Sequence, residues 1–206
     1  MVVSGDKVFL HIAKCGGTYF RRLLADNGVQ NAFRYWKLPT VADDDLGHLN
    51  MGNFHIHLKP GSYHLHTMMR HPYDRFLSSW QYVKTEFSNP PSPPLGISEE
   101  EILEHCDSPG QLANFLLENP RCLFERTCPW LHPQFLYVDE RVEVYAYEKK
   151  EDWQRLAHEF ELPENTLSGL EIKRYPITKA LEKIIQKVYA QDYELYKLLN
   201  ERKKNP

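Results

Sequence analysis

Cysteine is scarce in this chain, and no C-x-x-C pair, H-E-x-x-H motif or long apolar run occurs in it. Because these motifs are missing, the sequence gives little reason to expect a metal site. No apolar signal segment or membrane anchor precedes the first expected strand, which favours a cytoplasmic protein, with a trimmed lumenal domain as the alternative. The four cysteines leave the redox compartment open: Cys122 and Cys128 are close enough in sequence to pair in an oxidising lumen, but a cytosolic chain would keep them reduced.

The chain also lacks a strong charge of either sign. Its formal net charge is -3, which argues against nucleic acid as a partner and against a broad basic surface for a highly charged polymer. With 42% hydrophobic residues and 13% aromatics, residues 1–206 can form one domain with a substantial core. Residues 89–94 are rich in proline and indicate a loop within this domain, not a domain boundary. The loop is either a lid over the substrate or an ordinary surface loop.

Residues 7–24, KVFLHIAKCGGTYFRRLL, combine an apolar strand, a glycine pair and a helix start. Gly16 and Gly17 let the backbone turn so that its amide groups face a phosphate, and the helix adds its positive N-terminal end. Thr18 can cap that helix and contact the phosphate, while Lys14 supplies an ammonium group. The segment thus predicts an anion site suited to a nucleotide cofactor.

The position of the lysine separates this loop from the common nucleotide loop. G-x-x-x-x-G-K-[ST] requires lysine directly after the second glycine, whereas Lys14 precedes the glycine pair, and this weakens a kinase interpretation. The order H-x-x-K-x-x-G-T resembles the 5'-phosphosulfate loop of carbohydrate sulfotransferases, which reads much like HIPKTAGT. The resemblance implies that the donor contacts Lys14, Cys15, Gly16, Gly17, Thr18 and Tyr19.

A second element lies at residues 64–83, HLHTMMRHPYDRFLSSWQYV. It resembles the 3'-phosphate element of the same family, R-x-P-x-x-R-x-x-S-x-[WY]. Arg70 at a strand end can direct two N–H donors onto a phosphate, and Ser78, about two helical turns further on, can add a hydroxyl. The alternative is that Arg70 pairs with Asp74.

Histidines cluster between these two elements, and metal binding, ordinary packing and catalysis compete as interpretations. His64 and His66 would share one face of a strand, as a metal site requires. An ordinary satisfied or exposed histidine is expected at His48, His71 and His132.

The H-x-H pair formed by His55 and His57 resembles the one found in uronyl and heparan-type 2-O-sulfotransferases. One of the two is the base in those enzymes, and imidazole titrates near working pH, so we expect His57, or else His55, to take the acceptor proton. The chain departs from those relatives at Ile56, where they carry glycine.

The remaining chain predicts short helices over 97–106 and 108–119, each opened by a serine, and a strand followed by a helix over 142–156. Glu148, at the end of that strand, is expected to be structural. Residues 177–199 have helical spacing and resemble the C-terminal helix of the family. Lys173 and Arg174 could close over the 3'-phosphate, or else form an ordinary surface basic pair.

Together these elements predict an α/β fold, and the resemblance implies the three-layer, P-loop-like sulfotransferase fold with a central parallel sheet flanked by helices. It further implies a donor, 3'-phosphoadenosine 5'-phosphosulfate (PAPS, leaving the bisphosphate PAP), and in-line transfer to a hydroxyl, with a saccharide as the expected acceptor. The lumenal alternative would then be a Golgi enzyme without its anchor. A nucleotide kinase and a non-catalytic nucleotide-binding module are the other two interpretations.

Overall fold

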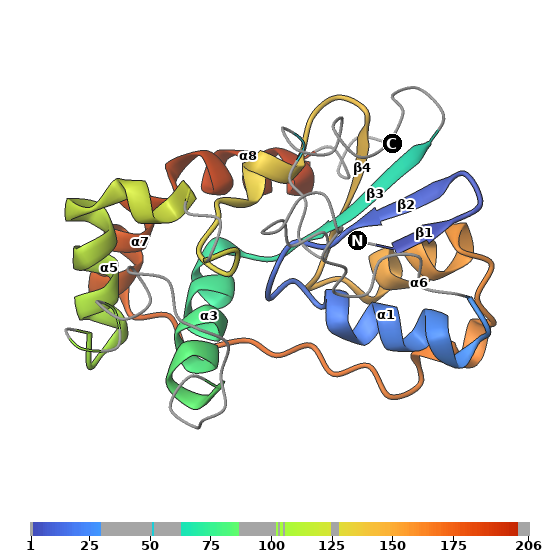
Figure 1. Ribbon diagram of the computed structural model, residues 1–206, viewed down its shortest axis with the longest axis horizontal. Helices are drawn as coiled ribbons and strands as arrows, with labels where there is room; N and C mark the ends of the chain where they lie inside the picture. Colours follow the sequence, from blue (N-terminus) through green and yellow to red (C-terminus); the bar gives the residue numbers. More distant parts are fainter. Residues whose placement is uncertain are drawn as a thin grey trace, which may run out of the picture.

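The computed structural model describes residues 2–29, 51, 63–86, 102, 104, 106–124 and 128–201 (Figure 1). Its strands form one sheet in the order β1-β2-β3-β4. Strands β2, β3 and β4 are parallel, and β1 pairs antiparallel with β2 at the edge. Their bounds are Val2–Ser4 for β1, Lys7–Leu10 for β2, His64–Met69 for β3 and Val142–Ala146 for β4. The predicted α/β class with a parallel sheet is therefore confirmed.

Helices cover both faces of this sheet, because neighbouring strand residues point to opposite sides. On one side, Met68 packs with helices α1 (Gly17–Asp26) and α6 (Lys150–Glu159) in one apolar cluster. On the other, Met69 packs in a separate cluster with helix α8 (Ala190–Glu201). The 3-10 helix η3 (Gln134–Tyr137) belongs to this second cluster.

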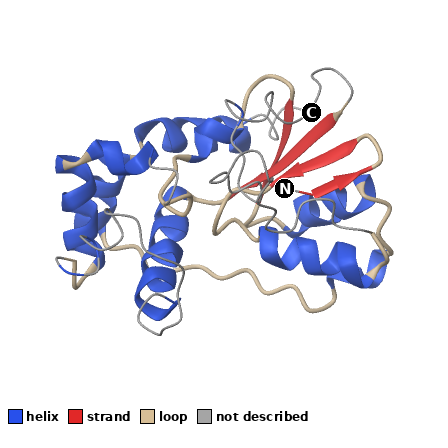
Figure 2. Cartoon of the chain, in the orientation of Figure 1, coloured by secondary structure: helices blue, strands red, loops and turns tan. Residues whose placement is uncertain are grey.

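A third apolar cluster joins helices away from the sheet (Figure 2). It lies among α3 (Pro72–Glu86), α5 (Pro109–Glu118) and α7 (Lys179–Val188). The serine cap expected for α5 is present, since the Ser108 side chain accepts from the Gln111 amide at 3.2 Å. Most of 97–106, the other predicted helix of this region, lies outside the described residues.

The C-terminal segment forms two helices, α7 and α8, where the sequence predicted one. The break falls at Tyr189, whose hydroxyl donates to the Leu131 carbonyl at 2.9 Å. Just beyond it, the buried Asp192 carboxylate accepts from the amides of Gln134 and Phe135 at 2.8 and 2.9 Å. Uninterrupted helical spacing gave no sign of these contacts, which require the chain to change direction.

Residues 168–178, called the strap below, lead into α7. They follow the 3-10 helix η4 (Glu164–Leu167) and cross the molecule from the α6 side to the α3 side (Figure 1). The strap thereby reaches both the sheet and the helical cluster.

All four cysteines are buried thiols. The possible pairing of Cys122 with Cys128 is therefore absent from the structure. In the described part of the chain, no helix is both long and apolar enough to cross a membrane.

His66, in the middle of β3, is a buried histidine within this core. Its Nδ1 lies 3.2 Å from the Tyr145 hydroxyl, and its ring packs edge-on against Phe160. Burial lowers the pKa of His66 below its ordinary value of 6.5, and the nearby Glu143 carboxylate offsets this only in part. The folded protein therefore favours the neutral imidazole.

We expect His66 to make the protein less stable in acid. The unfolded chain binds a proton at the ordinary pKa, so the free energy of unfolding falls as the pH drops below 6.5. Urea unfolding between about pH 5 and pH 8 should show a weaker pH dependence for His66→Gln than for the wild type. His64→Gln, at an exposed position on the same strand, is the control; equal slopes for both variants would contradict the assignment.

Candidate functional site

The loop between β2 and α1 begins with a tight turn. The Cys15 amide donates to the Ile12 carbonyl at 3.3 Å, and Lys14 adopts φ 65°. Gly16 follows with φ 84°. A lysine in the left-handed region is uncommon, because the Cβ atom meets the neighbouring carbonyl there.

Two buried arginines hold this turn from outside. Arg75 Nε donates to the Ala13 carbonyl at 3.1 Å, and Arg70 Nη1 donates to the Lys14 carbonyl at 3.2 Å. Arg70 stands directly after β3, the strand next to β2. The parallel sheet thus brings the two sequence elements together, as their order along the chain predicted.

Helix α1 begins directly after the turn. Gly16 is its N-cap, and the first bond of the helix runs from the Phe20 amide to the Gly16 carbonyl at 3.0 Å. The amides of Gly17, Thr18 and Tyr19 come before this bond, so they have no acceptor within the helix. Thr18 is exposed in the first turn and does not occupy the cap position predicted for it.

Both glycines of the loop are required by close approach. A Cβ atom on Gly17 would lie 1.9 Å from Cδ2 of His11, and one on Gly16 would lie 2.6 Å from the Trp153 ring. The backbone of the loop is therefore packed directly against two aromatic rings.

Cys15 fills space in the loop. Its thiol donates to Gln134 Oε1 at 3.1 Å, and burial raises its pKa to about 12. Nearby Arg75 and Arg70 lower that pKa only in part. Cys15 is therefore a buried packing residue whose thiol stays protonated at neutral pH.

Arg70 also holds the strap. Its Nη2 donates to the Lys173 carbonyl, and its guanidinium lies 4.6 Å from the Tyr147 ring centroid and 5.7 Å from that of Tyr175. Its Nε is buried and has no hydrogen-bond partner among the described residues. Asp74, the alternative partner considered from sequence, accepts from the Tyr175 amide at 2.8 Å.

The basic pair of the strap is exposed, and its two members differ in their surroundings. Lys173 Nζ donates to Gln81 Oε1 at 3.0 Å and lies 5.0 Å from the Tyr175 ring centroid. The Tyr175 hydroxyl donates to the same Gln81 oxygen at 2.8 Å. Lys173 is thereby tied to α3, whereas Arg174 acts on the Tyr196 side, where its charge lowers the pKa of that hydroxyl against the dominant effect of burial.

Helix α3 carries two further groups of interest. Ser78 is half-buried on it, two turns beyond Arg70. The Tyr82 ring centroid lies 4.2 Å from Lys14 Nζ, so the loop ammonium lies over this helix. A cation held against an aromatic face keeps its charge available to an incoming anion.

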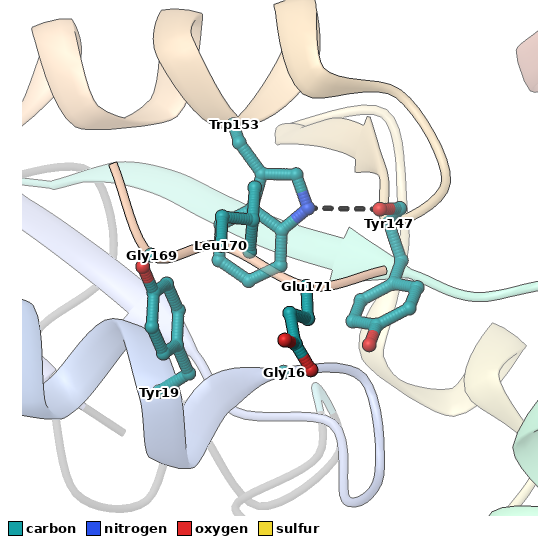
Figure 3. Close-up of a pocket in the computed structure, with 7 residues that line it drawn as sticks. All are labelled: Gly16, Tyr19, Tyr147, Trp153, Gly169, Leu170 and Glu171. Atoms are coloured by element: carbon teal, nitrogen blue, oxygen red, sulfur yellow. Dashed lines mark hydrogen bonds between the residues drawn. The ribbon is translucent and has the colours of Figure 1, made fainter. Parts of the chain in front are cut away.

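An aromatic cavity of about 200 Å³ opens beside the loop (Figure 3). Trp153 forms one wall, with its indole N–H donating to the Tyr147 carbonyl at 2.8 Å. The Tyr19 ring meets the indole edge-on at 5.6 Å between centroids. The Glu171 side chain points toward Gly16 in Figure 3. The cavity is lined by Gly16, Tyr19, Tyr147, Trp153, Gly169, Leu170 and Glu171.

The predicted histidines fall into three groups. His48, His55 and His57, which include both candidate bases, lie outside the described residues. His64 is exposed, 3.6 Å from Asp6, whereas His66 is buried in the core. His71 and His132 have the ordinary surroundings expected of them; their contacts are the rings of Tyr193 and Tyr196 for His71, and the hydroxyl of Tyr137 for His132.

Glu148 is structural, as predicted. One of its oxygens accepts from the His71 amide at 2.8 Å and the other from the Tyr196 hydroxyl at 2.7 Å.

Four residues at this site escaped the sequence analysis. Gln134, Tyr147, Trp153 and Tyr175 all lie far from the loop in sequence. A signal was available for Tyr147 and Trp153, which lie in the predicted strand and helix over 142–156, because parallel strands end at the same edge of a sheet.

No family model, curated protein or solved structure matches this chain. Its function must therefore be argued from the site itself.

Gly16→Ala should destabilise the protein by about 2 to 3 kcal/mol, because the new methyl group meets the Trp153 ring and the positive φ disfavours any side chain. Gly169→Ala is the matched control on the opposite wall, where a Cβ atom meets nothing within 4 Å. Thermal and urea unfolding would compare them. Equal stability of the two variants would show that the loop is not packed as described.

Proposed function

We propose that this protein is a PAPS-dependent sulfotransferase with a P-loop-like sulfotransferase fold, and that it transfers the sulfuryl group to a hydroxyl of a saccharide. The observation that carries the proposal is the left-handed Lys14, which lies two residues before the glycine pair and whose carbonyl accepts from the buried Arg70. The resemblance of both sequence elements to this family supports the same conclusion.

The conformation of Lys14 favours a functional role. A non-glycine residue in the left-handed region costs about 1 kcal/mol or more, and glycine would avoid that cost. The ammonium group of Lys14 lies against the Tyr82 ring of α3, and the flexible lysine side chain would let it reach an anion at the start of α1, where the helix amides already favour one. The 5'-phosphosulfate would bind there.

The second phosphate would bind near Arg70 and Ser78. In the structure, Arg70 Nη1 and Nη2 donate to the carbonyls of Lys14 and Lys173. Its buried Nε has no hydrogen-bond partner among the described residues. A 3'-phosphate could use Nε or replace the Lys173 carbonyl as acceptor, which would require the strap to shift. Lys173 and Arg174 belong to that strap and would then approach the same phosphate.

The aromatic cavity supports a nucleotide in particular. A volume of about 200 Å³ between Tyr19, Tyr147 and Trp153 suits a planar base, and the cavity shares Gly16 with the phosphate loop. Aromatic walls bind bases through stacking and edge contacts. A base there would be joined through its ribose to a phosphate at the loop.

In the proposed reaction, the acceptor oxygen attacks sulfur in line with the leaving phosphate. The S–O bond to the acceptor forms as the S–O bond to PAP breaks, and a histidine takes the acceptor proton. Lys14 would stabilise the negative charge that develops on the departing oxygen. His57, or else His55, is the proposed base on the grounds of the sequence alone.

The first test is calorimetric binding of PAP, compared with ATP and magnesium. We expect metal-independent binding of PAP that weakens in Arg70→Lys, because an ammonium cannot replace the forked guanidinium, and in Ser78→Ala. Lys7→Ala is the control, since Lys7 begins β2 at the end away from the loop and pairs with Glu161 at 2.9 Å.

Other outcomes would redirect the proposal. Preference for ATP with magnesium would favour the kinase, and binding of neither ligand would contradict a two-phosphate site. Binding of PAP without turnover of PAPS in any acceptor screen would favour a non-catalytic nucleotide-binding module.

Once an acceptor is found in a saccharide panel, Lys14→Ala should lower turnover by about a hundredfold, because preorganised charge at a leaving group contributes on that scale. His57→Ala should abolish transfer while PAP still binds. The measurement is the release of PAP from PAPS under saturating donor. Wild-type turnover by Lys14→Ala would remove the lysine from the chemical step, and full activity of both His57→Ala and His55→Ala would remove the histidine base.

A further inference from the structure

We propose that Gln134 is a positioning residue that fixes the phosphate loop and Arg70 relative to each other. The inference rests on the proposed function, because it concerns a ligand with phosphates at both the 5' and the 3' position. It assigns a role to a residue that touches neither phosphate itself.

The side-chain amide of Gln134 binds the backbone of Arg70 twice. Arg70 N donates to Gln134 Oε1 at 2.9 Å, and Gln134 Nε2 donates to the Arg70 carbonyl at 2.9 Å. This pair of bonds imitates the one that a neighbouring strand residue would make. It therefore holds Arg70 at the point where β3 ends and its own ladder to β4 stops at Met69.

The same side chain also reaches the loop. Gln134 Oε1 accepts from the Cys15 thiol at 3.1 Å, so one oxygen receives a donor from each of the two elements. Cys15 lies between Lys14 and Gly16, the two left-handed residues of the loop. A shift of Gln134 would consequently move both elements.

Gln134 is itself held rigidly. It is completely buried, and its backbone N–H donates to the Asp192 carboxylate at 2.8 Å. Asp192 also accepts from the Phe135 amide at 2.9 Å, which fixes the first turn of η3. Asp192 comes from α8, so this helix supports the site through Gln134.

This position requires a neutral side chain that offers one acceptor and one donor. Leucine would leave the Arg70 amide and carbonyl buried without partners, which is costly. Ionised glutamate would place a negative oxygen against the Arg70 carbonyl. Protonated glutamic acid, however, has one acceptor and one donor, and burial raises the pKa of such a group.

These properties give a test by ligand and by pH. The probes are PAP, adenosine 3'-phosphate and adenosine 5'-phosphate, and the bisphosphate advantage is the affinity ratio of PAP to the better monophosphate. We expect Gln134→Leu to weaken PAP binding about tenfold or more. It should also lower the bisphosphate advantage, because the loop and Arg70 are no longer held at a fixed distance from each other.

Gln134→Glu should behave differently. Its deficit in PAP affinity relative to the wild type should shrink as the pH falls from about 8 to 6, because the acid form restores the donor to Arg70. The ratio to wild type at each pH removes the titration of the phosphates themselves. A residue that only stabilises the fold would change the unfolding midpoint but would not change the bisphosphate advantage of folded protein.

Gln111→Leu is the matched control, because the Gln111 side chain also accepts from a backbone amide, that of Asp107 at 2.8 Å, but on α5. If Gln134→Leu does not fold, Cys15→Ala removes only the loop contact. We expect this variant to weaken the binding of adenosine 5'-phosphate about fivefold. Cys15→Ser, which retains a donor, should partly restore that binding.

The failure of the inference and that of the proposed function are distinguishable. If the wild type binds PAP but folded Gln134 variants keep the full bisphosphate advantage at every pH, the positioning role is wrong and the nucleotide site stands. If Cys15→Ala and Cys15→Ser bind alike, the loop contact is wrong. If the wild type binds none of the three nucleotides, both proposals are overturned.

Discussion

The structure of the site depends on two guanidinium groups whose donors are taken up by backbone carbonyls. Arg75 faces the Ala13 carbonyl and Arg70 faces that of Lys14, so the orientation of these peptide units follows from where the arginines are buried. A hydrogen bond to a charged group contributes about 1.5 to 3 kcal/mol, roughly the cost of a left-handed lysine. The arginines can therefore hold the turn in a conformation that its own sequence disfavours.

The same constraint extends to the strap. Arg70 binds the carbonyls of Lys14 and Lys173, so the loop and the strap meet at one side chain. The strap is also fixed to α3, because the Tyr73 hydroxyl accepts from the Thr178 amide and donates to the Pro176 carbonyl. Since the strap forms one wall of the aromatic cavity, a ligand that draws Arg70 away from Lys173 would alter the cavity as well. Binding at the arginine would therefore be coupled to binding in the cavity through the strap.

The sequence predicted those parts of the fold that local patterns determine. An apolar run predicted β2, alternation predicted β4, and the motif around Arg70 predicted β3. Ser108 marked the start of α5, because capping acts on neighbouring residues. Strand β1 was missed because three residues before a turn carry almost no pattern. The break at Tyr189 was missed because the apolar spacing continues through it, while its cause is a contact with Leu131.

The site was predictable to the same extent. Two motifs placed Lys14 and Arg70 near each other, because adjacent parallel strands end at the same edge of a sheet. Gln134 could not be found in this way, since its role arises from three hydrogen bonds to residues more than 60 positions away. The hydrogen bonds from the two arginines to backbone carbonyls could not be predicted either, because the sequence shows a charge but not the direction in which its donors point.

The choice of partners also explains how a chain of net charge -3 can present a positive site. Arg75 is near enough to Asp192 to lower the pKa of its carboxyl against the dominant effect of burial. Asp74 and Asp192 nevertheless accept hydrogen bonds from backbone amides, and each arginine donates to backbone carbonyls. A carbonyl satisfies a guanidinium donor without cancelling its charge, whereas a direct ion pair would cancel most of its field. Gln134 follows the same rule, since a neutral amide holds Arg70 without adding a negative charge beside it. The charges of Arg70 and Arg75 thus act on the loop, where they lower the pKa of Cys15 against burial, and they are held there by a few buried hydrogen bonds and not by a basic surface.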